Sequence, residues 1–271
     1  MGRRTAIPLY QDRHVAFVEA AATHPNRDKG LASLLQVGTG ARVDTIGHVH
    51  ADWFVFKRAK GSERPPLYLK IPAQDDCRKG TDTSPCGDCN QADHDGYEPK
   101  TPAGAGREIL IDDTWTNPVT GDREDFPLRD MVEHYFALDG THAPDGVQYG
   151  HKMIAGNGMS NGQLNTWVRD VGASAEISAE LREDWLRQHI DIDPDRDTPQ
   201  IMDFGTDERG NEIPDIITHD LRATYCTHLM RNDVSRDKAI NKTGHKTPDS
   251  MNPYISFAND EINQSEETMF Y

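Results

Sequence analysis

Apolar residues recur with a helical period along most of the chain and alternate with polar ones in three short stretches. The helical period predicts helices at 12–23, 28–37, about 42–50, 127–138, 162–173, 176–190, 218 to about 231 and 235–243. Alternation predicts strands at 53–56, 66–72 and 107–111. We expect the last two strands to pair in a small antiparallel sheet, so the pattern predicts an α+β fold that is mainly helical.

Two polar segments interrupt this pattern. Residues 74–99 have no periodicity and hold three of the four cysteines, and residues 191–215 are acidic and rich in Pro and Gly. We interpret both as insertions in a single domain that spans 1–271. Towards the C-terminus, Thr218 is a predicted N-cap, Gly244 a predicted helix stop, and Pro253 is expected to interrupt a last short helix.

The charge of the chain is strongly negative and evenly spread. Asp and Glu number 45 against 29 Lys and Arg, a net charge of −16, and Asp dominates the acids while Arg dominates the bases. A uniformly acidic, Lys-poor surface favours solubility in concentrated salt. We therefore expect a halophilic source, a haloarchaeon or one of its mobile elements. In high salt, net charge is weak evidence against DNA binding, because salt weakens phosphate contacts for every protein.

No run of 18 apolar residues is present, and no apolar stretch follows the first arginines. The sequence therefore predicts no membrane span and no secretory signal, and we expect a cytoplasmic protein.

The C-terminal part carries reactive side chains at defined separations. His219 and Arg222 are three residues apart, so they share one helix face near an N-terminus, where phosphate is favoured. His245, in the dipeptide Gly244-His245, comes 23 residues after Arg222, and Tyr254 follows nine residues later.

This spacing resembles the C-terminal motif of the tyrosine recombinases, the phage integrase family: His-x-x-Arg, then Gly-His, then a nucleophilic Tyr. The resemblance implies the family's catalytic-domain fold with its small antiparallel sheet. It also implies that Tyr254 attacks a DNA phosphodiester. Tyr225, inside the predicted helix, and Tyr271, the terminal residue, are not expected to be the nucleophile.

The family pattern also has an Arg in a Thr-Gly-x-Arg turn and a Lys in a β-hairpin. Thr39-Gly40-Ala41-Arg42 supplies the Arg, although Thr45 stands where the family usually has an acid. Lys100, directly before the 107–111 strand, is the predicted lysine, with Lys70 and Lys79 as alternatives.

The resemblance implies a role for each of these residues. Arg42 and Arg222 would bind the non-bridging phosphate oxygens. His219 and His245 would hydrogen-bond the phosphate or move the tyrosine proton, and Lys100 would protonate the leaving 5′-hydroxyl. A 3′-phosphotyrosyl intermediate would then be resolved by a 5′-hydroxyl, so catalysis needs no cofactor.

The implied partner is double-stranded DNA, on which the family assembles as a homo-tetramer. Family members usually carry an N-terminal core-binding domain that clamps the DNA. The predicted catalytic domain begins almost at the start of the chain and leaves no room for such a domain, so we expect no core-binding domain. The chain is then a minimal enzyme, works with a separate DNA-binding partner chain, or is a degenerate fragment of a mobile element.

The first insertion has the spacing of a metal site, Cys-x8-Cys-x2-Cys-x4-His. Three thiols and an imidazole suit a structural zinc ion. The predicted ligands are Cys77, Cys86, Cys89 and His94. Asp88 or Asp93 is an alternative fourth ligand, and ordinary reduced cysteines in a polar loop are the alternative to any metal. The histidines of His48-Val49-His50 are interpreted as a surface pair.

Two alternative functions remain open at this point. A type IB topoisomerase uses the same residue types, but relaxes one duplex instead of joining strands of two. A zinc-stabilised DNA-binding regulator derived from an integrase would be inactive. The complete set of Arg42, Lys100, His219, Arg222, His245 and Tyr254 argues against the second, because a site released from catalysis should lose such costly polar groups first.

Overall fold

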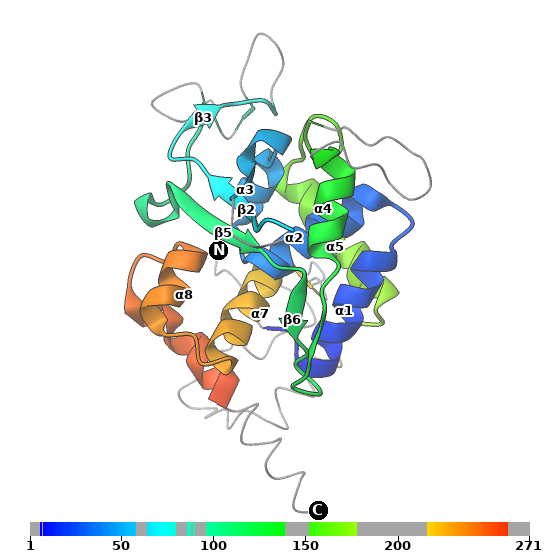
Figure 1. Cartoon of the computed structure of the whole chain (residues 1–271), viewed down its shortest axis with the longest axis vertical. Coiled ribbons are helices and arrows are strands. Elements are labelled where there is room, and N and C mark those ends of the chain that lie inside the picture. Colours follow the sequence, from blue (N-terminus) through cyan, green and yellow to red (C-terminus); the bar gives the residue numbers. More distant parts are fainter. Residues whose placement is uncertain are drawn as a thin grey trace, which may run out of the picture.

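The computed structural model describes residue 6 and residues 8–57, 64–79, 86–87, 89, 96–138, 152–177 and 216–259. Helices dominate, and short strands lie along one side of them (Figure 1). The acidic 191–215 segment lies outside the described residues, as does nearly all of the predicted 176–190 helix. Among the described residues, no helix is long and apolar enough to cross a membrane.

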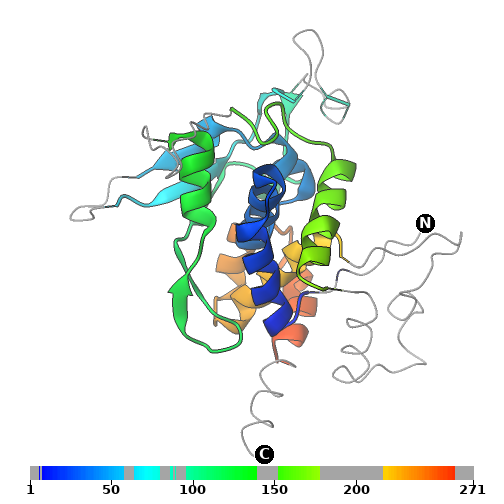
Figure 2. The same ribbon diagram turned by 90° about the vertical axis from the view of Figure 1, so that its right-hand side faces the viewer.

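The core is built around α2 (Arg27–Thr39), which is buried along most of its length. It contacts α1 (Gln11–Thr23), α4 (Leu128–Phe136), α5 (Asn161–Ser174) and α7 (Thr218–Arg231). Figure 2 shows α1 and α2 between α4 and α5. These helices confirm the predicted ones to within a few residues. α1, α4 and α5 each present one buried face to the core, whereas α2 and α7 are buried on nearly all sides.

The predicted pairing of the 66–72 and 107–111 strands is confirmed. β1 (Phe54–Phe56), β2 (Leu67–Ile71) and β5 (Arg107–Ile111) form an antiparallel sheet in the order β1-β2-β5. Ile71 pairs with Arg107, and Leu69 pairs with Ile109. Alternate residues of β5 are buried, so Arg107 shares the inward face with Ile109 and Ile111.

Two small hairpins were not predicted. β3 (Asp75–Asp76) pairs with β4 (Gly96–Tyr97) inside the first insertion, and β6 (Thr114–Thr116) pairs with β7 (Arg123–Asp125). Strands of two or three polar residues show no hydrophobic alternation, which explains why the pattern missed them. Cys77, Cys86 and Cys89 all lie in the connection between β3 and β4.

The start of α7 differs from the prediction. Thr218 is the first helical residue and not the N-cap, which is Ile217. The Ile217 N–H donates to the Asp220 carboxylate (2.9 Å), and the Thr218 N–H donates to the Asn165 side chain of α5 (3.1 Å). Neighbouring side chains thus satisfy the first N–H groups of the helix.

The C-terminal end is shaped by a glycine and a proline. α8 (Arg236–Thr243) ends, as predicted, at Gly244, which adopts φ +67°. A 3₁₀ turn, η6 (Pro248–Met251), then leads into a helix over 252–259. The expectation that Pro253 interrupts this helix was wrong. Pro253 lies in its first turn, where no helical N–H is needed.

Candidate active site

Arg42 is presented by the turn between α2 and α3 (Val43–His48), where it is the N-cap of α3. Gly40 makes the turn possible. Its φ is +58°, and a Cβ there would lie 2.3 Å from the Tyr225 ring of α7. The half-buried Arg42 side chain donates from Nη1 to Thr101 Oγ1 (3.0 Å) and to the Gly244 carbonyl (3.4 Å). Arg42 is therefore tied to the segment before β5 and to the end of α8.

Arg222 lies on α7 and is the largest fully buried side chain among the described residues, at 1% exposed. Its Nη1 donates to the Gly40 carbonyl, and its Nη2 lies 3.4 Å from His245 Nε2. Burial, above all, lowers the pKa of Arg222. The turn that carries Arg42 thus also holds Arg222 in place.

His245 follows Gly244 directly and is buried. A Cβ on Gly244 would lie 2.9 Å from Gly104 Cα, so only glycine permits this close approach of backbones. The His245 Nδ1 is 2.6 Å from Thr243 Oγ1. Burial, followed by the charge of Arg222, lowers the pKa of His245 to about 3, so the imidazole is neutral at neutral pH.

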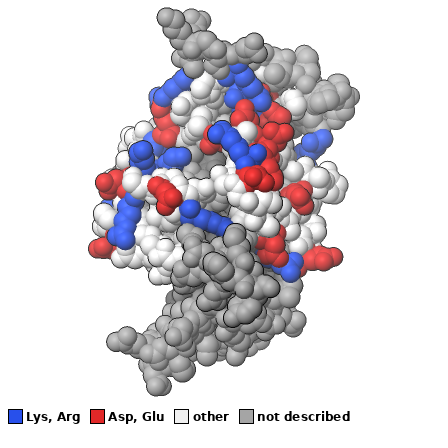
Figure 3. All heavy atoms as spheres, turned by 60° about the horizontal axis from the view of Figure 1, so that its bottom comes forward, with Lys and Arg blue, Asp and Glu red and all other residues white. Residues whose placement is uncertain are grey.

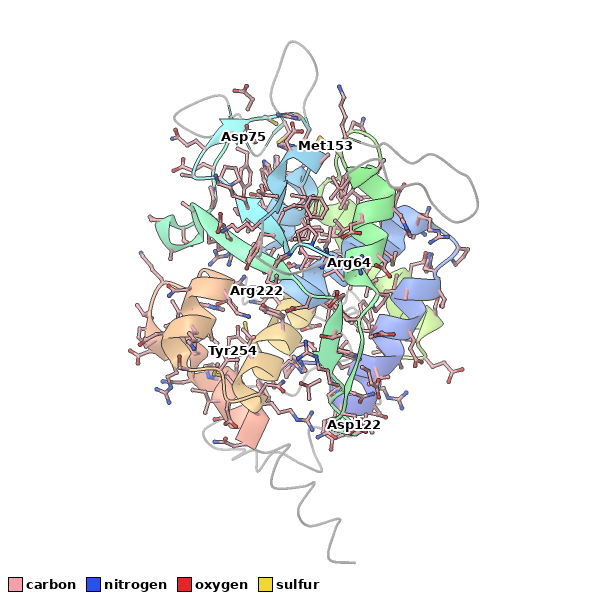
Figure 4. The ribbon with its side chains drawn as sticks, viewed as in Figure 1. Arg64, Asp75, Asp122, Met153, Arg222 and Tyr254 are labelled. Carbon is pink, nitrogen blue, oxygen red and sulfur yellow. The ribbon has the colours of Figure 1, made fainter. Side chains whose placement is uncertain are left out.

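Tyr254 packs in a small apolar cluster formed by α7, α8 and the 252–259 helix. Its ring centroid is 5.7 Å from that of His245. Figure 4 shows Arg222 and Tyr254 near each other between α7 and α8. Burial raises the pKa of Tyr254 to about 12, although the charges of Arg222 and Arg42 act in the opposite direction. The phenol is therefore protonated at neutral pH.

Arg107 is a member of this site that the motif search missed. It is 9% exposed, and its Nη1 donates to the Lys242 carbonyl at the end of α8 (2.8 Å). Burial, followed by the charge of Arg222, lowers its pKa to about 10. The sequence does contain a signal for Arg107. It alternates with Ile109 and Ile111 along an apolar strand, so all three side chains face the same way.

His219 and Lys100 lie at the edge of the site. Both are exposed, and the charge of His219 contributes to the lowered pKa of His245. Lys100 precedes Thr101, the hydrogen-bond partner of Arg42. An open groove of about 450 Å³ lies beside Arg107, between residues 103–108 and the end of α8.

The alternatives to Lys100 lie elsewhere. Lys70 faces outwards on β2, opposite Glu108 and on the other face of the sheet from Arg107. Lys79 lies against Gly47 of α3 and against Gly158. The lysine assignment stays a prediction.

Arg42, Arg107 and Arg222, here called the arginine cluster, have an unbalanced charge. Among the residues that the structure describes, no carboxylate forms a salt bridge with any of the three. Burial lowers the pKa of each guanidinium. For Arg107 and Arg222, the charge of a neighbouring arginine lowers the pKa further. Buried charges without a counterion are unfavourable, so the arrangement suits an anion with several acceptor oxygens. Elsewhere, basic and acidic side chains are interspersed on the face drawn in Figure 3.

The predicted metal ligands come together with one change. Cys77, Cys86 and Cys89 form a group with His48, whereas His94 lies outside the described residues. The interpretation of His48 and His50 as a surface pair was wrong, since both are 2% exposed. His50 Nε2 instead pairs with the Asp75 carboxylate (2.9 Å).

No protein-family model matches the sequence, and a search of curated proteins finds no relative. Solved structures do match. The XerH site-specific recombinase, in its post-cleavage complex with palindromic difH, aligns with a TM-score of 0.51 at 11% identity, over 98% of this chain and 54% of that one. The Tn1549 transposon integrase, in complex with transposon right end DNA, aligns with a TM-score of 0.50 at 13% identity, over 98% and 67%. The fold is that of a tyrosine recombinase catalytic domain.

A λ integrase dimer bound to a COC′ core site also aligns, with a TM-score of 0.47 at 14% identity, over 94% of this chain and 60% of that chain. The present chain thus spans about half to two thirds of the length of these tyrosine recombinases. At 11–13% identity the likeness to the XerH and Tn1549 structures shows the fold alone.

Proposed function

We propose that this chain is a site-specific DNA recombinase or integrase that cleaves and rejoins DNA through a 3′-phosphotyrosyl intermediate at Tyr254. The observation that carries the proposal is that the fold brings Arg42 together with the C-terminal residues Arg222, His245 and Tyr254. The arginines there have no carboxylate partner among the described residues. A phosphodiester supplies the missing negative charge and two non-bridging oxygens. Planar guanidiniums bind such oxygens through paired N–H donors.

In the proposed reaction the Tyr254 oxygen attacks phosphorus, and the bond from phosphorus to the 5′-oxygen breaks. Arg42 and Arg222 stabilise the negative charge that develops on the non-bridging oxygens. His245 is neutral and lies beside the tyrosine ring, so it can accept the phenolic proton or a hydrogen bond from it.

Lys100 is proposed to protonate the 5′-oxygen as it leaves, and His219 to hydrogen-bond the phosphate. Both are exposed at the rim of the site, where a bound duplex would reach them. In the second half-reaction a 5′-hydroxyl from the partner strand attacks the phosphotyrosine. The phosphodiester bond is restored without a nucleotide or a metal, because the covalent intermediate conserves the bond energy.

Duplex DNA is therefore the proposed partner. The XerH and Tn1549 structures both contain DNA. Strand exchange between two duplexes requires more than one active site, so we propose that copies of this chain assemble on DNA as a tetramer, with or without a separate DNA-binding chain. Mass measurement of the DNA complex would count the copies.

The direct test is a trapping assay with a pool of nicked duplexes in which the sequence on both sides of the nick is randomised. Cleavage near the nick releases a short fragment, so the protein stays covalently attached and is detected on a denaturing gel. The native chain is expected to form the adduct. Tyr254→Phe is expected to form none while still binding DNA, and Tyr271→Phe is the matched control that should behave like the native chain. An adduct with Tyr254→Phe would rule out this nucleophile.

Plasmid relaxation, strand joining and the trapping assay together separate the alternative functions. A type IB topoisomerase would relax a supercoiled plasmid without joining strands of two duplexes. An inactive regulator would bind DNA and form no adduct in either the native chain or the variant. Sequencing the trapped duplexes would identify the preferred target.

A further inference from the structure

A second cluster of chemically reactive side chains lies apart from the arginines. His48 ends α3, Cys77 follows β3, and Cys86 and Cys89 come from the 74–99 insertion. Their potential ligand atoms all lie within 4.8 Å of one another. We call these four residues the cysteine–histidine cluster. Figure 4 shows Asp75, two residues before Cys77, well away from Tyr254.

The distances within the cluster match a tetrahedral metal site. His48 Nε2 is 3.4 Å from Cys86 Sγ and 3.2 Å from Cys89 Sγ. Zinc bound at usual Zn–S and Zn–N distances gives a tetrahedron with edges of about 3.5–3.8 Å. Small shifts of the side chains would therefore place one ion within coordination distance of all four ligand atoms.

The histidine is oriented for coordination. Its Nδ1 lies 2.8 Å from the Asp44 carbonyl oxygen, which can only accept, so Nδ1 must carry the proton. In the neutral ring Nε2 then has a free lone pair, and it points at two sulfur atoms. A backbone carbonyl that fixes the ring in this way is a common outer contact of zinc-bound histidines.

Neither hydrogen bonding nor a disulfide would account for the whole cluster. A thiol is a weak donor, so three thiols around one imidazole gain little from hydrogen bonds alone. None of the four cysteines of the chain forms a disulfide, and a disulfide would leave the third cysteine of the group unused. Three soft sulfur ligands and one imidazole favour Zn²⁺ over the hard cations Mg²⁺ and Ca²⁺.

The surroundings of the cluster are ordered by direct contacts. The Tyr97 ring of β4 lies 4.9 Å from the His48 ring, and its hydroxyl is 3.0 Å from Thr45 Oγ1. Asp75 of β3 accepts from Trp53 Nε1 (2.7 Å). These contacts bring the insertion to α3 and leave the four ligands facing one another.

We propose that His48, Cys77, Cys86 and Cys89 bind one structural Zn²⁺ that ties the 74–99 insertion to α3. The fourth ligand is thus His48, which comes 29 residues before Cys77, and not His94, which follows the cysteines. The ion holds the far end of the six-residue helix whose N-cap is Arg42. The proposal goes beyond the proposed function and does not depend on it.

The test measures metal in the protein purified without chelator. Elemental analysis is expected to find about one zinc per native chain, and the same content in His94→Ala. His48→Ala and Cys89→Ser are expected to lose at least half of it. Zinc well below stoichiometry after purification and reconstitution, iron in its place, or full loading of His48→Ala would each overturn the proposal.

A second measurement on the native chain covers the case in which the variants fail to fold. Co²⁺ replacing zinc is expected to give the intense visible absorption of a tetrahedral thiolate site. A weak spectrum of octahedral Co²⁺ would overturn the proposal. Chelation should also expose three thiols to a thiol reagent, while the buried Cys226 stays protected until the chain unfolds. Equal reactivity of the three thiols before and after chelation would likewise overturn it.

Discussion

The arginine cluster and the cysteine–histidine cluster are opposites in charge and in construction. The first concentrates positive charge and suits an anion, whereas the second concentrates electron-donating ligands and suits a cation. The arginines are fixed by backbone carbonyls of Gly40, Gly244 and Lys242, so the site is organised before any ligand arrives. The cysteines come from an insertion whose two strands are only two residues long, so much of its order would depend on the ion.

This difference indicates how the two regions should respond to change. A site held by backbone contacts should keep its shape when its ligand is absent, and lose function when one donor is altered. A site held by coordination should lose its local structure when the ion leaves.

Arg222→Lys should have the largest effect. Lysine keeps the positive charge but cannot donate to the Gly40 carbonyl and to a phosphate with the planar geometry of Arg222. Loss of one preorganised donor lowers the rate of such reactions by about 10²–10³-fold. The rate of adduct formation, measured with the trapped duplexes, should fall by that order, and zinc content should not change.

The matched control for this variant is Arg169→Lys, which alters an exposed arginine of α5. It should cleave at the native rate. If Arg222→Lys also cleaved at the native rate, the guanidinium would not be a donor to the reacting phosphate.

Removal of zinc should have the next largest effect, this time on stability. Even a loss of about 3 kcal/mol would lower the Tm by roughly 6–12 °C for a chain of this size. Thermal unfolding with and without chelator measures the shift, and added zinc should reverse it. His48→Ala should show a low Tm with or without chelator, whereas an unchanged Tm of the native chain would show that the insertion is ordered by protein contacts alone.

Acid should destabilise the chain through two histidines, His228 and His245, whose pKa values are lowered in the folded chain. Burial lowers the pKa of His245 to about 3 and that of His228 to about 4, so each is neutral when folded. The unfolded chain, with a histidine pKa of about 6.5, binds more protons below that pH, so stability falls as the pH drops from about 6.5 towards about 4. The slope is at most about 1.4 kcal/mol per pH unit for each histidine.

Urea unfolding between about pH 7 and pH 5 measures this slope, and His228→Gln should reduce it. Phosphate in the buffer should also reduce the contribution of His245 to the slope. An anion bound to the arginine cluster would raise the pKa of His245 towards its value in the unfolded chain. A stability that is flat over this range would contradict the assigned neutral state of both histidines.

Salt should have the smallest and broadest effect. We propose that the net charge of −16 reflects adaptation to a halophilic setting, because salt near ~1 M reduces the Debye length to about 3 Å and screens self-repulsion. The Tm should therefore rise between low salt and about 1 M KCl, and zinc content should stay constant. A protein that is most stable well below ~0.5 M KCl would contradict this proposal.

The main helices, the strands β2 and β5 and the spacing of the C-terminal motif could be read from the sequence, because each is a local pattern. Periodicity over a dozen residues fixes a helix face, and the separations of Arg222, His245 and Tyr254 can be counted along the chain. The structure brings these three together with Arg42. What they do with DNA stays a prediction that the trapping assay tests.

The sequence did not predict Arg107 or His48, and the reasons differ. Arg107 had a readable signal, an inward position on β5, but a five-residue strand is usually interpreted only for its apolar residues. His48 had no local signal. Its partners are 29 or more residues away, and only the fold brings α3 to the insertion, so spacing pointed to the nearby His94 instead. Tertiary contacts of this kind are not encoded in any short window.

The hydrogen bond from Arg222 to the Gly40 carbonyl spans 182 positions of the chain, and that from Arg42 to Gly244 spans 202. During synthesis, the turn that carries Arg42 leaves the ribosome long before α7 and α8 exist. At that stage the nascent chain has no assembled site, and Tyr254 is the last of the site residues to emerge. On the proposed function, this order delays the reactive state until α7 and α8 have been made, which would be a safeguard for a protein that breaks DNA.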